Sequence, residues 1–319
     1  MSIKLRTEIE KFNYPFTITH RDSLFFMGSC FTENIGNLFA YYGFKTLLNP
    51  FGIAYNPISV FNQLEIIIDK KYCDKDDFFI KDEIWKSFYF HSDIDDLNLE
   101  SAVSNVNKII DESYYFLKNS DYLLLTFGTS NAFKLKNTGM IVANNHKVPL
   151  NQFDPYVINS EEVVDYFSIF YKKILEFNPK LRIIFTVSPV RHTRLGLIEN
   201  SRSKARLINA IENIVIDQDV FYFPSFEIMI DDLRDYRFYN EDLIHPNNLA
   251  IRYIWDILGD MIFNEESIMI NSRIDKLKKA YNHRPFNPQS QGYMDFRDKL
   301  INDIELFKLE FPYIELNLD

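Results

Sequence analysis

The sequence predicts an α/β protein: a mostly parallel sheet of five strands with helices packed on both of its faces. The main observation is that short apolar runs alternate with stretches of about 10 to 20 residues whose apolar side chains recur at helical spacing. Strands that alternate with helices form βαβ units, which bury a parallel sheet on both faces. The composition agrees, because 46% of the 319 residues are hydrophobic and 25% are charged, which provides a packed core and excludes a disordered chain.

Five apolar runs are the expected strands of this sheet. Glycine is scarce in the chain, nine residues in all, so each glycine is expected where the backbone requires one. Gly28 follows the first run, Gly52 lies in the loop after the second, and Gly128 follows the third. The five predicted strands cover residues 23–27, 45–48, 121–127, 181–187 and 220–223.

Helices are expected between these strands, and several carry end signals. Gly43 suits the residue just beyond the first helix, where a left-handed backbone is common. Asn56 followed by Pro57 is typical of a helix start, and Ser160 is predicted to cap a later helix. The predicted helices cover residues 32–42, 56–69, 99–117, 160–177, 201–216 and 247–263.

The chain is expected to divide at about residue 264. Residues 1–264 carry the α/β pattern, interrupted by a hairpin predicted over residues 133–143. From residue 265 to 319 the pattern changes to a polar helix, a turn and a second helix. We expect this C-terminal helical extension to pack on the core.

Charge and cysteine usage exclude several function classes. With 35 Lys and Arg against 45 Asp and Glu the net charge is −10 and no basic patch is present, so nucleic acid is not an expected partner. No apolar run is long enough to span a membrane, and the first residues lack the apolar region of a signal peptide, so a cytoplasmic protein is expected. Cys30 and Cys73 are too few for a disulfide framework or a zinc site, and neither a metal nor a cofactor is expected. Cys73 lies in an acidic loop that would raise its thiol pKa, so we expect it to be inert. The sequence leaves the oligomeric state open.

The first strand-to-helix turn contains two candidate nucleophiles, Ser29 and Cys30. Ligands of open parallel sheets bind at the carboxyl ends of the strands, where this turn lies. The unpaired N–H groups at the start of the next helix would stabilise a thiolate or an oxyanion, so the Cys30 pKa is expected to be lowered. The Ser29 hydroxyl is expected to bond to neighbouring loop backbone instead.

Asp242 and His245 form a candidate acid–base pair at the last strand-to-helix junction. In a turn that leads into a helix, this spacing lets the carboxylate reach the near ring nitrogen of the histidine. The far nitrogen then remains available as a base.

Five motifs in a fixed order carry a family resemblance. They are Gly-Ser-Cys-Phe-Thr at 28–32, Asn-Pro-Phe-Gly-Ile-Ala-Tyr-Asn-Pro at 49–57, Phe-Gly-Thr-Ser at 127–130, Ser-Pro-Val-Arg-His at 188–192 and Asp-Leu-Ile-His-Pro at 242–246. Over residues 3–264 the chain resembles the GSCFA-domain proteins, which are similar to the SGNH (GDSL-like) hydrolases. The resemblance implies a three-layer, flavodoxin-like α/β/α sandwich with strand order 2-1-3-4-5, and ester or acyl-group chemistry.

The resemblance also implies roles for individual residues. The hydrolase serine position falls on Cys30, and the preceding aspartate position falls on Ser29. The glycine whose N–H helps to form the oxyanion hole falls on Gly52. The third block falls on Gly128 to Asn131, where Ser130 occupies the usual asparagine position and Asn131 follows it. Asp242 and His245 match the last block, whereas the first and third blocks depart from the superfamily pattern.

Other polar residues are weaker candidates. Arg191, His192 and Gly128 are candidate substrate-binding residues. Arg191, or Arg194, would bind a substrate carboxylate or phosphate, unless the loop after the fourth strand is simply anchored by internal hydrogen bonds. His91 and His146 lie in irregular insertions, either as lid residues or, more simply, as structural histidines.

Two functions remain open from the sequence. The first is a hydrolase or acyltransferase acting on a small-molecule or glycan ester. The second is a binding or protein-interaction module whose catalytic site has decayed, which the altered first and third blocks favour and the intact Asp242–His245 pair opposes.

Overall fold

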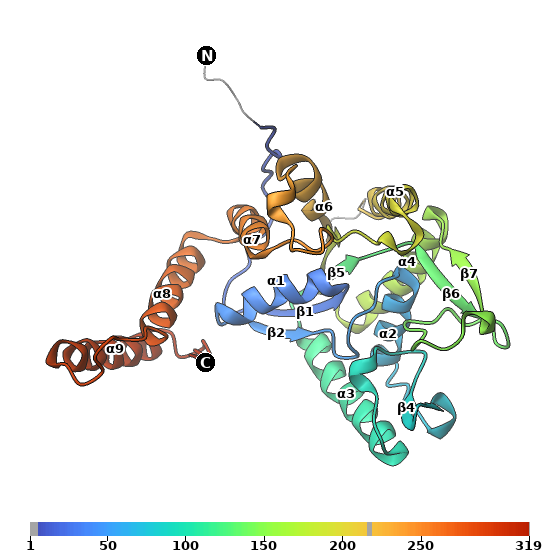
Figure 1. Ribbon diagram of the computed structural model, residues 1–319, viewed down its shortest axis with the longest axis horizontal. Helices are drawn as coiled ribbons and strands as arrows, with labels where there is room; N and C mark the ends of the chain where they lie inside the picture. The colour runs from blue at the N-terminus through green and yellow to red at the C-terminus, as the bar shows by residue number, and fades with distance from the viewer. Residues whose placement is uncertain (1–5, 216–218, 319) are drawn as a thin grey trace.

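The computed structural model describes residues 6–215 and 219–318, and in that part of the chain the core is a five-stranded parallel sheet (Figure 1). Its strand order is β2-β1-β5-β8-β9, and all four neighbouring pairs are parallel. This confirms the α/β class and the strand order 2-1-3-4-5 of the predicted strands. The strands are β1 Ser23–Gly28, β2 Lys45–Leu48, β5 Tyr122–Phe127, β8 Arg182–Val187 and β9 Val220–Phe223.

The strands bury both faces, as their apolar runs predict. Along β1, Phe25 and Met27 belong to one apolar cluster, whereas Leu24 and Phe26 belong to another on the opposite face. This follows from the alternation of side chains along a strand. Helices α2, α3, α4 and α5 supply the first cluster, and α1 and α7 supply the second, so the molecule has three layers. Figure 1 shows α3 and α7 on opposite sides of the sheet.

The helices of these layers begin and end close to the predicted residues. Asn56 caps α2 by accepting the Ser59 N–H, as predicted. The predicted cap at Ser160 is wrong, because Asn159 accepts the Glu162 N–H and Ser160 is the first residue inside α4. The helices are α1 Cys30–Tyr41, α2 Pro57–Ile68, α3 Leu99–Asn119, α4 Ser160–Phe177, α5 Leu197–Ile214, α6 Ser225–Glu227 and α7 Asn248–Ile262.

Short elements fill the connections. The hairpin predicted over 133–143 is reduced to one bridge between Lys134 and Ile141, because β6 (Asn131–Leu135) pairs with the later strand β7 (Phe153–Val157). A further small hairpin joins β3 (Phe79–Lys81) to β4 (Ile84–Lys86). The single-turn helices are η1 Lys75–Asp77, η2 Ser92–Ile94, η3 Leu150–Gln152, η4 Thr193–Leu195 and η6 Tyr236–Phe238, and η5 Ile228–Asp232 is a π-helix.

The C-terminal segment forms two helices, α8 (Glu265–Tyr281) and α9 (Gln291–Glu310), which extend from the α/β layers as an arm (Figure 1). The start of α8 contacts the N-terminal segment, where the Ser267 hydroxyl donates to the Ile18 carbonyl. No helix within the described ranges has the length and apolarity needed to cross a membrane.

Candidate active site

Gly28 places the first candidate residues at the carboxyl end of β1. Its φ is +140°, and a Cβ at this position would lie 2.1 Å from the Thr126 carbonyl oxygen of β5. Only glycine fits that close approach. The chain therefore turns sharply into α1 beside the ends of β1 and β5.

Ser29 and Cys30 occupy the start of α1. Ser29 is the N-cap residue and is 1% exposed, and its hydroxyl has no hydrogen-bond partner in the part of the chain that the structure describes. The expected bond from this hydroxyl to loop backbone is thus wrong. Cys30 is the first helical residue and is partly exposed.

The pKa of the Cys30 thiol is raised, whereas the sequence predicted that it would be lowered. Burial raises its pKa, as does the nearby Glu33 carboxylate, while Lys204 and the N–H groups of Cys30 and Phe31 act in the opposite direction. The predicted lowering of the Cys30 pKa is wrong, because the helix N-terminus is outweighed by burial and Glu33. Cys73 is buried and its pKa is raised to about 12, chiefly by burial, in the direction expected of an inert thiol.

Asp242 and His245 form a closely bonded pair. One carboxylate oxygen, Oδ1, accepts the backbone N–H groups of Ile244 at 2.9 Å and His245 at 3.0 Å. The other, Oδ2, lies 2.6 Å from the His245 Nδ1. These three contacts lower the Asp242 pKa to about 2, so the carboxylate is ionised at neutral pH and accepts a hydrogen bond from the Nδ1–H group. The His245 Nε2 makes no hydrogen bond to any described residue, and the side chain is 44% exposed.

The turn between Asp242 and His245 contains a residue with an unusual backbone conformation. Leu243 has φ +59°, the left-handed region that non-glycine residues seldom adopt. The Asn240 N–H donates to the His245 carbonyl at 2.8 Å, and Tyr239 forms a bridge with Pro246. These contacts hold the imidazole beside its carboxylate.

His192 and Tyr55 contact each other and interact with residues of the candidate site. The rings of His192 and Tyr55 meet edge to face with centroids 5.1 Å apart. Burial lowers the His192 pKa to about 4, and the charges of Lys204 and His245 lower it further. Cys30 in turn raises the Tyr55 pKa, after burial. His192 is therefore close to His245, and Tyr55 is close to Cys30.

The predicted oxyanion-hole groups are mostly engaged elsewhere. The Gly52 N–H donates to the Asn49 carbonyl at 2.7 Å, and the N–H of Gly128, predicted as a substrate-binding residue, donates to the Tyr55 carbonyl at 2.8 Å. Ser130 is fully buried and its hydroxyl donates to Ser203 on α5 at 3.2 Å. Asn131 differs, because the buried oxygen of its side-chain amide has no hydrogen-bond partner within residues 6–215 or 219–318.

Arg191 contacts Tyr239. Its guanidinium donates to the Tyr239 hydroxyl at 3.1 Å and lies 4.9 Å from the centre of that ring. It lines a separate open cavity of about 130 Å³ with Arg234 and Tyr236.

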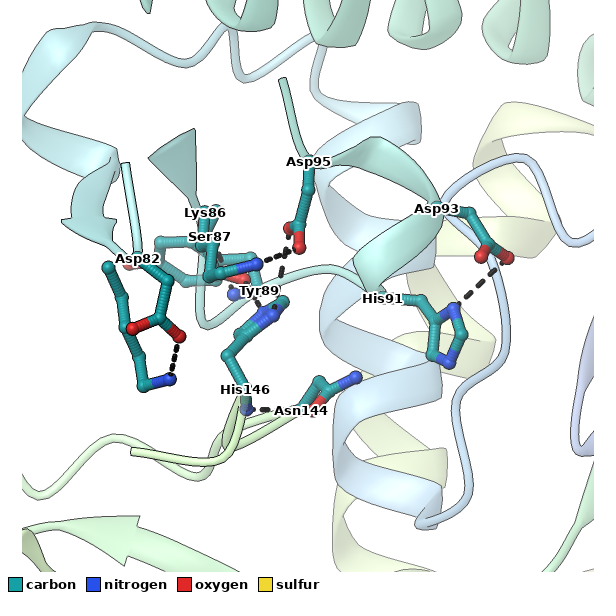
Figure 2. A network of polar contacts seen from close by, with 10 residues as sticks. Asp82, Lys86, Ser87, Tyr89, His91, Asp93, Asp95, Asn144 and His146 are labelled. Atoms are coloured by element: carbon teal, nitrogen blue, oxygen red, sulfur yellow. Dashed lines mark hydrogen bonds and ion pairs between the residues drawn. The ribbon is translucent and has the colours of Figure 1, made fainter. Parts of the chain in front are cut away.

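His91 and His146 belong to a polar network in the insertions (Figure 2). The His146 Nε2 donates to the Ser87 carbonyl at 2.8 Å, and its Nδ1 lies 3.6 Å from Asp95, which also pairs with Lys86. The His146 side chain is 1% exposed, which fits the structural alternative. The His91 Nδ1 lies 3.0 Å from Asp93, and its Cβ would be 2.5 Å from a Cβ at Gly52.

Lys204 was not expected from the sequence. It lies on α5, is 1% exposed, and donates to the carbonyls of Gly128 at 2.7 Å and Ser188 at 2.6 Å. Burial lowers its pKa to about 7, and Cys30 acts in the opposite direction. The burial of Lys204 could have been predicted from helical spacing. Leu207 and Ile211, three and seven residues later, lie on the same face of the helix and are buried.

No group of three or more His, Cys, Asp or Glu side chains in the described ranges is placed to hold a metal ion.

Comparison with solved structures finds esterases of low similarity. A carbohydrate esterase family 3 protein from Talaromyces cellulolyticus has 8% identity and a TM-score of 0.38, with 79% of this chain and 98% of that chain covered. An acetyl esterase mutant, solved with an acetate ion, has 8% identity and a TM-score of 0.34, with 79% and 99% covered. The acetyl xylan esterase Est2A from Butyrivibrio proteoclasticus has 12% identity and a TM-score of 0.37, with 77% and 63% covered.

A search of curated proteins finds no significant match. Family comparison is decisive instead. The GSCFA family matches residues 23–257, and the C-terminal domain of GSCFA domain proteins matches residues 274–318. The resemblance seen in the motifs is confirmed, and the chain belongs to the GSCFA family.

Proposed function

We propose that this protein is an ester hydrolase or acyltransferase in which Cys30 is the nucleophile, His245 the base and Asp242 the residue that orients the base. The observation that carries the proposal is the Asp242–His245 pair. Both carboxylate oxygens hold the histidine, through its backbone and through Nδ1, while Nε2 has no partner in the described residues and the ring is accessible. A carboxylate that fixes the tautomer leaves Nε2 able to accept a proton.

The proposed reaction follows from these roles. The Cys30 sulfur adds to the ester carbonyl as the thiol proton passes to the His245 Nε2. Collapse of the tetrahedral intermediate breaks the bond to the alcohol oxygen, which takes the proton from His245. Water or another acceptor, deprotonated by His245, then attacks the thioester and releases the thiol.

The oxyanion requires donors that are not already engaged. The N–H groups of Cys30 and Phe31 are oriented toward the sulfur and lie in the first helical turn, where N–H groups lack partners within the helix. We assign the oxyanion to the N–H groups of this turn together with the side-chain NH2 of Asn131, which is the donor end of that amide. Gly52 and Ser130 would contribute only after breaking their present bonds to Asn49 and Ser203. One oxyanion donor is worth about 3 kcal/mol of transition-state stabilisation.

The alternative is a binding or protein-interaction module whose catalytic site has decayed. The raised pKa of Cys30 and the engaged third-block serine favour it. It assigns no chemical role to the accessible His245.

Covalent trapping distinguishes the two proposals. Wild-type protein is incubated with a short-chain aryl ester, hydrolysis is followed by absorbance, and the acylated peptide is mapped by mass spectrometry after rapid acid quenching. We expect an acyl group on Cys30 and loss of both signals in Cys30→Ala, with Cys73→Ala as the matched control. Acylation or fluorophosphonate labelling of Ser29, with Cys30 unmodified, would show that Ser29 is the nucleophile. Absence of both hydrolysis and acylation in wild type would favour the binding module.

A further inference from the structure

Arg191 lines a small cavity that the proposed reaction does not use. The cavity has a volume of about 130 Å³ and is open to solvent, and the rest of its lining comes from residues 229–239, between α6 and α7. A protein cavity of about 150 Å³ is large enough to hold a benzene molecule. The size therefore suits a ligand with one ring or a short branched chain.

The guanidinium of Arg191 carries a charge that no carboxylate neutralises. Among residues 6–215 and 219–318 its one hydrogen-bond partner is the Tyr239 hydroxyl, at 3.1 Å, and it makes no salt bridge. A guanidinium has five N–H donors, so most of those on Arg191 remain available to a ligand. Their planar arrangement matches the two oxygens of a carboxylate.

The other two charged residues of the lining already have partners. The Arg234 guanidinium donates to the Asp231 carboxylate at 2.9 Å. The Asp235 carboxylate accepts from the Arg237 guanidinium at 2.8 Å. Three arginines against two aspartates leave one positive charge, that of Arg191, so the cavity favours a ligand with a single negative charge.

The remaining lining is apolar or aromatic. Met229 is buried, Tyr239 is 7% exposed, and the Tyr236 and Tyr239 rings have centroids 6.1 Å apart. The Arg191 guanidinium lies 4.9 Å from the centre of the Tyr239 ring, so the charge and the aromatic surface adjoin. A ligand would bury an apolar body against these side chains while its charged end meets Arg191.

We propose that this cavity is a binding site for a small carboxylate with a ring or a branched apolar body, and that Arg191 binds the carboxylate. The inference goes beyond the proposed function and does not depend on it, because neither Cys30 nor His245 lines the cavity.

The site nevertheless shares a loop with the proposed base. The Arg191 N–H donates to the Ile244 carbonyl at 3.4 Å, and Tyr239 forms a bridge with Pro246. Ile244 and Pro246 are the residues on either side of His245. A bound carboxylate would therefore contact two residues that hold the backbone around His245.

Binding can be measured at the cavity itself through Met229. The protein is labelled with ¹³C at its methionine methyl groups, the Met229 signal is assigned from its loss in Met229→Leu, and sodium benzoate is added. We expect the Met229 signal to shift and saturate with a Kd in the millimolar range, because water screens an ion contact in an open site. The methionines outside the cavity should keep their positions.

Two variants separate the role of Arg191 from a general effect of charge. Arg191→Gln should weaken benzoate binding on the order of tenfold, since a charge-assisted hydrogen bond is lost. Arg194→Gln is the matched control, because Arg194 lies in the same loop, carries the same charge and does not line the cavity. Its Kd should equal that of wild type.

Two further probes test the chemistry of the ligand. Benzyl alcohol has the same ring without the charge, and inorganic phosphate has charge without an apolar body, so both should bind more weakly than benzoate. If Arg191→Gln fails to fold, Tyr236→Ala replaces it, because Tyr236 is 64% exposed and its loss should still weaken binding severalfold.

Four results would overturn the inference. They are an unshifted Met229 signal in wild type, an unchanged Kd in folded Arg191→Gln or, in its place, in Tyr236→Ala, an equal loss of binding in Arg194→Gln, and binding of either further probe as tightly as benzoate. Ester hydrolysis is measured separately, so its absence would refute the proposed function and leave this site standing.

Discussion

His245 and His146 each lie beside an aspartate, but their surroundings differ. His245 is bonded through Nδ1 to Asp242 at 2.6 Å, is 44% exposed, and its Nε2 makes no hydrogen bond to a described residue. His146 is 1% exposed, its Nε2 donates to the Ser87 carbonyl, and its aspartate also pairs with Lys86 (Figure 2). Burial lowers the His146 pKa, while Asp242 makes no salt bridge to a Lys or Arg among the described residues.

A carboxylate beside an imidazole is therefore not enough for catalysis. A catalytic histidine needs a second nitrogen without a partner and access for the substrate. His245 meets both conditions, and His146 meets neither. The comparison assigns chemistry to one pair and stability to the other, and substitutions in the two pairs test that division.

The largest expected effect is on activity in His245→Ala. Ester hydrolysis should fall by about 10³-fold, because the base is lost. The free energy of unfolding measured in urea should stay within about 0.5 kcal/mol of the wild-type value. The substituted side chain is accessible, so little packing is removed. His283→Ala, an exposed histidine of the C-terminal arm, is the control and should behave as wild type. Unchanged hydrolysis in His245→Ala would contradict the catalytic role proposed for the Asp242–His245 pair.

The matched pair Asp95→Asn and Asp242→Asn should separate stability from activity. Asp95→Asn leaves the buried Lys86 ammonium without its carboxylate and should lower the free energy of unfolding by about 3 kcal/mol. Asp242→Asn should lower hydrolysis by about 10²-fold with a much smaller loss of stability, since both side chains of that pair are accessible. Urea melts and aryl-ester assays on both variants give the comparison. A reversed pattern would exchange the roles assigned to the two pairs.

The pH dependence of stability should report the buried pair. Because the folded pKa of His146 is lowered, the unfolded chain binds the proton first as the pH falls below about 6.5, and stability decreases in that window. His20 and His192, each with a pKa lowered to about 4, act in the same direction. In His146→Gln, which keeps a donor for the Ser87 carbonyl, the slope of unfolding free energy against pH should decrease by up to about 1.4 kcal/mol per pH unit. An identical slope in the variant would show that His146 gains its proton in the folded state as easily as in the unfolded chain.

The smallest effect belongs to a third pair, His91–Asp93. The Asp93 side chain is 62% exposed, so its contact with the His91 Nδ1 at 3.0 Å is screened by water. Asp93→Asn should change the free energy of unfolding by less than about 0.5 kcal/mol and leave hydrolysis unaltered. A marked loss of activity in this variant would instead place the pair, which lies against Gly52, in the site.

The sheet was predictable because its evidence is local. Each strand is a short apolar run with helical periodicity on either side, and the spacing of Asp242 and His245 lies within one turn. The β6–β7 pairing was missed because Asn131–Leu135 finds its partner beyond an intervening loop, while the nearer Ile141 supplies only a bridge. The shift of the α4 cap from Ser160 to Asn159 reflects two neighbouring residues that both favour this position.

The chemistry of the site was harder to predict because it depends on burial. The N–H groups at the start of α1 are visible in the sequence, but the desolvation that outweighs them at Cys30 is set by packing. Lys204 has the appearance of an ordinary surface lysine until α5 turns that side chain toward the ends of β5 and β8. The hydrogen bond that occupies the Ser130 hydroxyl likewise comes from Ser203, which is distant in the chain, whereas the Gly52 N–H bonds within its own loop.

The contact between Ile18 and the start of α8 affects how the chain folds as it is made. The Ser267 hydroxyl reaches the Ile18 carbonyl across 249 residues, next to the bond from the Ile18 N–H to the Ile262 carbonyl. At synthesis rates of about 5 to 20 residues per second, the segment before β1 waits about 10 to 50 seconds on the ribosome for these partners. Loop closure over such a distance is slow, and apolar strand surface stays exposed until it occurs. The contacts of Ile18 therefore form only after most of the chain has been synthesised.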